Sequence, residues 1–407
     1  MPDAGSPTPR SEPAPLFPVS RVHLDELSDR IGIMQHAIGR RPDPTHGYCT
    51  DDVARALSVD LLHGRELGWS AVDASVDRSM AFLAAAFDPA TGRFRNFRDS
   101  AGRWVEPVGS EAVGPGAVGS EDAHARAALG LGEAAAEAGD PRVCAAAAAL
   151  FDQALPATLR LTHPRPLAAA VLAADAAIRG GSRPAAVALP RLAAAVWLLT
   201  EPFGRARRAD WPWPDPVLTY ENGLLPRALI VAGDRLGDAA LVDRGLRLLD
   251  WLVSVQTSPD GHFSPIGSDS WWPIGGRKAQ FDQQPIEATA LLLAAEAAFE
   301  ATGDGRHRAT MEWSYAWFLG RNDGGRSVAR PVIGSGHDGL TRSGVNLNQG
   351  AESTLMWLIA LERIRASRRS AAAEAMGVAD ASGVSGPVPA KGRRVVRRPI
   401  LPEAALA

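Results

Sequence analysis

Residues 51–62, DDVARALSVDLL, decide the fold class, because a helix over this stretch carries apolar side chains on almost every side. In residues 71–87, by contrast, apolar side chains recur at steps of three and four and form a single stripe. The residues of that stripe are Val72, Val76, Met80, Leu83 and Phe87. The first stretch therefore predicts an inner helix that is buried on most faces, and the second predicts an outer helix that packs on one side.

This alternation of inner and outer helices continues along the chain, with few signs of strands. Outer helices are predicted near residues 23–38, 71–87, 141–159, 186–200, 239–256 and 306–320. Inner helices are predicted near residues 51–66, 121–138, 164–179, 220–235, 283–301 and 348–366. Because short connections make successive helices antiparallel, all the inner helices point the same way. The sequence thus predicts an all-α fold, an (α/α)6 toroid of six helical hairpins with long loops at one end of the barrel. An open superhelical solenoid is the alternative.

The 407 residues divide into one folded region and two flanking segments. Residues 1–19 are rich in proline and serine, and residues 371–407 run through ASGVSGPVPAKGRRVVRRP. Neither segment can bury enough apolar surface to fold alone, so both are predicted to be disordered, the second as a basic tail. The toroid domain is predicted over residues 20–370.

Composition limits the kinds of partner. The net charge of −3 and the pI near 6.3 give no electrostatic reason to expect nucleic acid or an anionic membrane. No stretch reaches the roughly 18 uninterrupted apolar residues that a membrane helix needs, and the first residues lack the order of a secretory signal. Cys49 and Cys144 match neither a disulfide framework nor a metal-ligand spacing. We therefore expect a protein of the cytoplasm that acts on small molecules.

Polar and aromatic residues are concentrated just before or at the first turns of the inner helices. The segments are THGYCTDD (45–52), GSEDAHAR (119–126), THPRP (162–166), WPWPDPVLTYENG (211–223), SDSWWPIGGRKAQFDQQPIEA (268–288) and SGHDGLTRSGVNLNQGAEST (335–354). Because parallel inner helices bring these segments to one end of the barrel, the sequence predicts a site there. Loops of this length typically build a binding or catalytic site.

The acids at two of these helix starts allow two interpretations. Residues 50–52 (TDD) and 120–122 (SED) suit a hydroxyl N-cap followed by carboxylates that interact with the helix dipole. Arg55 and Arg126 follow at the spacing of surface ion pairs. The other interpretation is general acid and base catalysis by a pair of carboxyl groups. The candidates for that pair are Asp52 and Asp122, with Asp51 and Glu287 as substitutes.

Histidine, amide and aromatic side chains in the same segments contribute nothing to capping and favour a ligand. Tryptophans beside carboxylates, amides and arginine suit a sugar, which offers C–H faces for stacking and hydroxyl groups for polar contacts. We therefore predict a carbohydrate site, and packing beneath long loops is the alternative for the tryptophans. The predicted binding residues are His46, Tyr48, Glu121, His124, Arg126, Trp213, Tyr220, Trp271, Trp272, Gln284, Asp338, Asn348 and Glu352.

Nothing in the sequence predicts a metal or a cofactor. It contains no HExxH and no paired CxxC motif. Its glycine-containing runs match neither a P-loop nor a dinucleotide fingerprint, and no serine lies in a nucleophile-elbow pattern.

Five motifs mark the helix starts: HGYCTDDVARAL, GSEDAHARAALGLG, LTYENGLLPRALI, AQFDQQPIEA and GVNLNQGAEST. Together they resemble a bacterial group of six-hairpin glycosidase-like proteins, often labelled glycosyltransferase-associated. The resemblance spans residues 20–366 and implies the (α/α)6 toroid. The chain departs from the group's pattern at Val53, Pro214, Asp215, Glu221, Gly223 and Leu224.

Three functions remain as hypotheses. The leading one is a glycoside hydrolase or related glycan-processing enzyme that uses two carboxyl groups. The second is a sugar epimerase or isomerase, which would use histidines as acid and base. The histidines available for that role are His46, His124, His262 and His337. The third, implied by the resemblance, is a noncatalytic glycan-binding partner of a glycosyltransferase.

Overall fold

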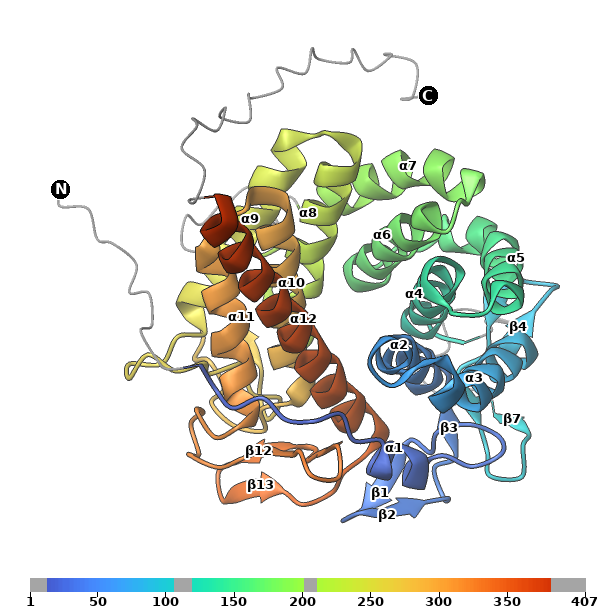
Figure 1. The fold of residues 1–407 in the computed structure, drawn as a ribbon, viewed down its shortest axis with the longest axis horizontal. Coiled ribbons are helices and arrows are strands. Elements are labelled where there is room, and N and C mark those ends of the chain that lie inside the picture. The colour runs from blue at the N-terminus through green and yellow to red at the C-terminus, as the bar shows by residue number, and fades with distance from the viewer. Residues whose placement is uncertain (1–12, 106–118, 201–210, 382–407) are drawn as a thin grey trace. The chain divides into compact units, whose positions relative to one another are not determined.

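Two concentric sets of helices form the folded part of the chain in a computed structural model that describes residues 13–105, 119–200 and 211–381 (Figure 1). The inner helices are α2 (Thr50–Leu67), α4 (Glu121–Glu137), α6 (Pro164–Arg179), α8 (Leu224–Leu236), α10 (Pro285–Thr302) and α12 (Ala351–Ala381). The outer helices are α3 (Asp73–Ala86), α5 (Pro141–Thr158), α7 (Arg183–Leu199), α9 (Ala239–Val255) and α11 (Gly305–Phe318). Each inner helix packs against the next inner helix from α2 to α10, as an (α/α)6 toroid requires.

Small residues let the inner helices approach one another closely. A Cβ atom added at Gly132 of α4 would lie 2.5 Å from the carbonyl oxygen of Ala173 on α6. One added at Gly223, at the start of α8, would lie 2.3 Å from the carbonyl oxygen of Ala290 on α10. The alanine and glycine content of these helices therefore sets the spacing of the inner ring.

The two ends of the ring meet at α12. Thr289 of α10 donates a hydrogen bond of 2.9 Å to the carbonyl oxygen of Met356 on α12. On the other side, Arg55 of α2 forms an ion pair of 3.3 Å with Glu352 at the start of α12. These contacts close the toroid between the last inner helix and the first.

The outer helix predicted over residues 23–38 is wrong in extent, because α1 covers only Val22–Leu27. The chain turns directly afterwards, since the carboxylate of Asp29 accepts the backbone N–H groups of Ile31 and Gly32. An antiparallel hairpin follows, made of β1 (His36–Ile38) and β2 (Arg41–Asp43). The apolar spacing of this stretch resembles a helix, but the local hydrogen bonds of the aspartate favour a turn.

The predicted disorder over residues 1–19 is wrong for residues 13–19, which lie against the helices. Tyr315 of α11 donates a hydrogen bond to the carbonyl oxygen of Pro15, and the ring of Phe17 packs edge-on against Trp357 of α12. Ala14 is buried. A proline-rich segment that cannot fold alone is thus ordered by surfaces that the rest of the chain supplies. The remainder of that prediction lies outside the described residues.

The chain forms two compact units, Met1–Arg365 and Ala366–Ala407. The helix predicted to end near residue 366 continues to Ala381, so the predicted disordered tail begins inside α12. Alanine, arginine and glutamate dominate this stretch and are strong helix formers. The rest of the predicted tail, 382–407, lies outside the described residues.

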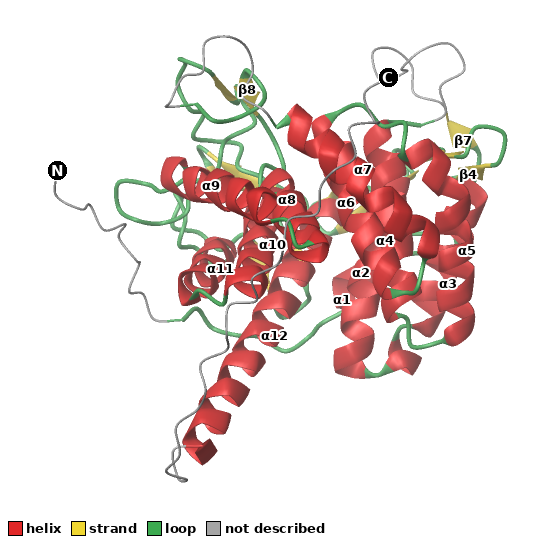
Figure 2. Ribbon diagram, turned by 90° about the horizontal axis from the view of Figure 1, so that it is seen from above, coloured by secondary structure: helices red, strands yellow, loops and turns green. Residues whose placement is uncertain are grey.

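Short antiparallel strands in the loops add to the helices (Figure 2). They are β3 (Tyr48–Cys49), β4 (Phe87–Asp88), β5 (Arg93–Phe94), β6 (Phe97–Arg98), β7 (Trp104–Val105), β8 (Val217–Leu218), β9 (Trp272–Pro273), β10 (Ala329–Arg330), β11 (Ser335–Gly336), β12 (Gly339–Thr341) and β13 (Gly344–Asn346). Figure 2 shows β4, β7 and β8 on the same side of the helical layer.

Candidate functional site

A cavity of about 690 Å³ lies where the N-terminal ends of the inner helices meet. Every inner helix contributes to its wall, from its first turn or the residues just before it. The lining residues are Gln35, His36, Cys49, Asp51, Asp52, Arg55, Asn96, Phe97, Ser120, Glu121, Asp122, Arg126, His163, Pro166, Tyr220, Glu221, Gln284, Ile286, Asp338, Asn346, Gly350, Glu352 and Ser353. Helices that run parallel thus gather chain segments that are far apart in the sequence.

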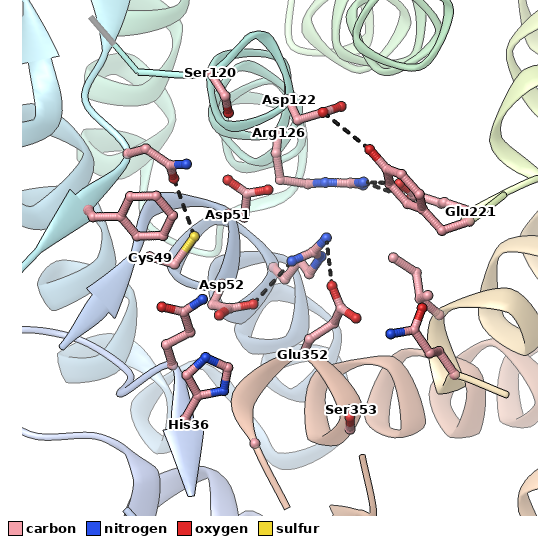
Figure 3. Close-up of a pocket in the computed structure, with 18 of the residues that line it drawn as sticks. His36, Cys49, Asp51, Asp52, Ser120, Asp122, Arg126, Glu221, Glu352 and Ser353 are labelled. Atoms are coloured by element: carbon pink, nitrogen blue, oxygen red, sulfur yellow. Dashed lines mark hydrogen bonds and ion pairs between the residues drawn. The ribbon is translucent and has the colours of Figure 1, made fainter. Parts of the chain in front are cut away.

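Arg55 organises one side of this cavity. Its guanidinium donates a hydrogen bond of 3.0 Å to Oδ1 of Asp52 and lies 3.3 Å from a carboxylate oxygen of Glu352. Figure 3 shows both acids directed toward the same space. Both Arg55 and Asp52 are buried. The spacing in the sequence suggested a surface pair between Arg55 and Asp51, and that interpretation is wrong because α2 turns Arg55 into the barrel.

Arg126 organises the other side. It forms an ion pair with Glu221, with nitrogen–oxygen distances of 2.6 and 2.5 Å. The surface pair predicted between Arg126 and Asp122 is therefore also wrong. Asp122 instead accepts a hydrogen bond of 3.3 Å from the hydroxyl group of Tyr220 (Figure 3).

Glu221 has a strained backbone that Glu287 holds in place. Its φ of 49° lies in the left-handed region, which a residue with a side chain rarely adopts. The buried carboxylate of Glu287 accepts the N–H of Glu221 and a hydrogen bond of 2.9 Å from the side-chain amide of Asn222. Glu287 lies behind the cavity wall, so the prediction that it catalyses directly finds no support. Its position is that of a residue that orients Glu221.

Asp51 lies between Asp52 and Asp122, and its charge acts on both (Figure 3). One of its carboxylate oxygens is buried and accepts no hydrogen bond from any described residue. Among the helix starts, Ser120 caps α4 as predicted by accepting the N–H of Ala123. Thr50 does not cap α2, because its hydroxyl donates to the carbonyl oxygen of Arg95. No side-chain hydrogen bond caps the start of α2.

Burial and mutual repulsion raise the pKa values of several of these acids. Burial, together with the charges of Glu352 and Asp51, raises the pKa of Asp52 to about 7. Burial and the charge of Asp51 also raise the pKa of Asp122 above its usual value. Burial raises the pKa of Glu352 as well. The pKa of Glu221 is lowered, since Arg126 and Arg55 outweigh its burial. The cavity thus holds acids with different tendencies to carry a proton.

Nine of the residues predicted from sequence to form the site line this cavity. They are Asp51, Asp52, Glu121, Asp122, Arg126, Tyr220, Gln284, Asp338 and Glu352. Trp271 lies next to this group, with its ring centroid 6.3 Å from that of Tyr220. The structure brings these residues together from the starts of α2, α4, α8, α10 and α12 and from the loop that holds Asp338.

Several predicted binding residues have structural positions instead. The hydroxyl of Tyr48 donates to Asp29, and the ring of His124 is fully buried beside Thr158. Trp213 and Trp272 pack against Trp251 in a cluster of rings. For Trp213 and Trp272 these contacts favour the packing alternative, because large apolar rings beneath long loops fill the space between the loops and the outer helices.

Two further predicted residues lie beside the cavity rather than on its wall. His46 contacts His36 edge-on and has an exposed side chain. The side-chain oxygen of Asn348 accepts the N–H of Gly39 and so holds the β1–β2 turn.

Several polar residues of the wall were not predicted from the sequence. Arg55 and Glu221 were not assigned to the site. Arg55 could have been, because it follows the acid pair Asp51–Asp52 by one helical turn, and Glu221 could have been, because it is the acid of the YENG motif. His36 of β1 and Asn96, between β5 and β6, reach the cavity by a path that the sequence pattern does not predict, whereas His163 lies in THPRP, one of the segments predicted to gather at this end. Nδ1 of His163 donates a hydrogen bond of 2.9 Å to the carboxylate of Glu121.

Two features are absent from the part of the chain that the structure describes. No group of three or more histidine, cysteine, aspartate or glutamate residues there is arranged to hold a metal ion. No described helix is both long and apolar enough to cross a membrane.

No protein-family model matches the sequence, and no curated protein matches it. The fold is similar to that of cellobiose 2-epimerase from Spirochaeta thermophila, with a TM-score of 0.60 and 13% identity over 84% of this chain and 93% of that chain. It is similar to a sugar epimerase from a ruminal bacterium, with a TM-score of 0.59 and 11% identity over 84% and 98% of the two chains. A GH76 alpha-mannanase from Bacteroides thetaiotaomicron gives a TM-score of 0.53 and 11% identity over 79% and 87%. These likenesses confirm the (α/α)6 toroid that the helix pattern and the resemblance predicted.

Proposed function

We propose that this cavity binds a carbohydrate and that the protein cleaves a glycosidic bond there with carboxyl groups. The observation that carries the proposal is Asp52, whose pKa is raised to about 7, in one cavity with Asp51 and Asp122. Glycoside hydrolases separate acid from base by giving two carboxyl groups different environments. The epimerases and the mannanase of similar fold are named for sugars, which supports the same class of ligand.

Asp52 is the proposed proton donor. Its Oδ1 is held by Arg55, and its Oδ2 accepts no hydrogen bond from a described residue. In the proposed reaction, the bond between the anomeric carbon and the leaving oxygen breaks while the proton of Asp52 moves to that oxygen. Arg55 then stabilises the carboxylate that remains.

Asp122 is the proposed second carboxyl group. It activates a water, whose oxygen bonds to the anomeric carbon while its proton passes to Asp122, or it attacks that carbon itself and water cleaves the adduct. The hydroxyl of Tyr220 orients it by donating to its Oδ2. The stereochemistry of the first-formed product distinguishes the two routes.

The test is a screen of purified protein against oligosaccharides and other glycosides whose leaving oxygen needs a proton, with product release measured for wild type, Asp52→Asn and Asp122→Asn. A matched control is Asp60→Asn, which neutralises another buried aspartate of α2, paired with Arg21 away from the cavity. The proposal expects release by wild type and by the control, and loss in both cavity variants while they remain folded. Release that survives in Asp52→Asn and Asp122→Asn would refute it.

Sugar epimerisation is a second candidate, because two imidazoles, His36 and His163, lie on the cavity wall. Burial lowers the pKa of His36, which suits a base that takes the proton at C2 of a reducing sugar. The histidines predicted for this role do not line the cavity. Incorporation of deuterium at C2 of a reducing sugar in heavy water, lost in His36→Ala, is the expected result for this candidate.

A noncatalytic partner of a glycosyltransferase is the third outcome of the same screen. It would show glycan binding in wild type and in both aspartate variants, with no turnover in any of them. We further propose that the protein acts in the cytoplasm, which its two free thiols, Cys49 and Cys144, support.

A further inference from the structure

The cavity wall has an unusual charge balance. Among the described residues, seven carboxyl groups line it, against two guanidinium groups. The carboxyl groups belong to Asp51, Asp52, Glu121, Asp122, Glu221, Asp338 and Glu352. Clefts lined by one sign of charge attract ligands of the opposite sign.

Both guanidinium groups are already engaged. Arg55 is paired with Asp52 and Glu352, and Arg126 is paired with Glu221. Neither cation is therefore free to bind an acidic group of a ligand. Any anionic sugar would have to break one of these buried pairs, which is costly because it leaves a carboxylate without its partner.

Three carboxyl groups of the wall have no cation in contact among the described residues. Asp122 accepts only the Tyr220 hydroxyl, and Asp338 accepts the N–H of Gly350. Asp51 has a buried oxygen without any described partner. Among the described residues, the hydrogen-bond acceptors of this cavity that have no donor are thus predominantly carboxylate oxygens.

The neighbouring cations contact other groups, although the charge of Arg165 also acts on Asp122. Arg165 stacks on the ring of Tyr220, at 4.6 Å from its centroid, and donates to the backbone oxygen of the same residue. His163 is bound to Glu121. Burial lowers the pKa of His36, so that imidazole is neutral near pH 7.

From this balance we infer that the sugar bound in the cavity carries a protonated amine, so that the ligand is an amino sugar rather than a neutral or an acidic one. The inference rests on the proposed function, because it assigns the substrate class of that same cavity. The ammonium group would lie against Asp51 and Asp122, where it replaces the missing cation and donates up to three hydrogen bonds. A uronic acid or a phosphorylated sugar would be repelled by the same carboxylates.

The test is direct binding, measured by calorimetry or ligand-observed NMR, of matched monosaccharides. Glucosamine, mannosamine and galactosamine are each compared with the parent sugar that has a hydroxyl at C2 and with the corresponding uronic acid. We expect at least one amino sugar to bind about tenfold more tightly than its parent, as one charged hydrogen bond implies. Added salt should reduce the difference in affinity between the amino sugar and its parent. The uronic acids should bind most weakly.

Asp51→Asn is the informative variant, since it removes charge and keeps the shape of the side chain. It should abolish the preference for the amine, whereas Asp60→Asn, in the buried pair with Arg21, should keep it. Equal binding of amino and neutral sugars, tighter binding of an acidic sugar, or binding of none of them would overturn the inference. Because the assay needs no turnover, an amine preference without glycosidic cleavage would refute the proposed reaction alone, and cleavage of neutral glycans without that preference would refute this inference alone.

Discussion

At the scale of single residues, the environment of each acid separates roles that the sequence presents as equivalent. Asp51 and Asp52 are adjacent in the chain, yet Asp52 is held by Arg55 while an oxygen of Asp51 has no described partner. The sequence predicted that the paired acids would lie together, because helix starts converge in this fold. It could not predict which acid meets which arginine, since that depends on how each helix is rotated about its axis.

The pH dependence of the reaction is a prediction at this scale. Asp52 must hold a proton to act as donor, and its pKa is about 7. The rate should therefore fall as pH rises through that value, because the donor loses its proton. Asp52→Asn should lower the rate by about 10²–10⁴-fold and remove this alkaline limb from the profile. A wild-type rate that keeps rising above pH 8 would contradict the assignment.

Glu287 gives a second residue-scale prediction. Glu287→Ala leaves the N–H of Glu221 and one N–H of the Asn222 side-chain amide, whose other bond goes to the carbonyl oxygen of Thr219, without an acceptor, which should cost about 2–4 kcal/mol of unfolding free energy. Glu300→Ala, which changes an exposed glutamate of the same helix α10, is the control and should cost less than about 0.5 kcal/mol. Urea unfolding of both variants measures the difference, and similar midpoints would show that Glu287 does not hold the strained turn.

At the scale of elements, the periodicity of apolar residues predicted the helices that pack on other helices. It did not predict the segments whose conformation is set by local polar contacts. α6 begins and ends where expected, as a helix buried on most faces. α8 begins at Leu224, four residues later than predicted, because Tyr220, Glu221 and Asn222 form the strained turn at the cavity. A left-handed residue that is not glycine leaves no signal in the sequence.

Helix spacing yields a prediction for this scale. Gly132→Ala should destabilise the protein by about 1–3 kcal/mol through overpacking against α6, although alanine is the better helix former. Gly305→Ala is the matched control, because nothing lies within 4 Å of its added Cβ at the start of α11. That variant should be neutral or stabilising by up to about 1 kcal/mol. Thermal melts of the two variants that shift in the same direction would contradict close packing of α4 on α6.

At the scale of the whole molecule, closure of the ring turns separate helix starts into one cavity. The number of hairpins and their common direction were predictable, because both follow from helix count and short connections. The contribution of residues 13–19 was not predictable, because a proline-rich segment shows no periodicity. Contacts with α11 and α12 order it.

Phe17 tests this contribution. Its ring packs against Trp357, and its carbonyl oxygen accepts a hydrogen bond of 2.8 Å from Arg365. Phe17→Ala should lower the unfolding free energy by about 2 kcal/mol, less than for a fully buried ring because this one is half-buried. An unchanged denaturation midpoint would show that the segment does not stabilise the closed ring.

The dependence of the Asp52→Asn rate on the leaving group tests the central claim most directly. If Asp52 donates the proton, the variant should cleave a dinitrophenyl glycoside, whose leaving group needs no proton, at close to the wild-type rate. The same variant should lose about 10²–10⁴-fold on an unactivated glycoside of the same sugar. An equal loss on both substrates would contradict the role of Asp52 as proton donor, and with it the proposed division of labour in the cavity.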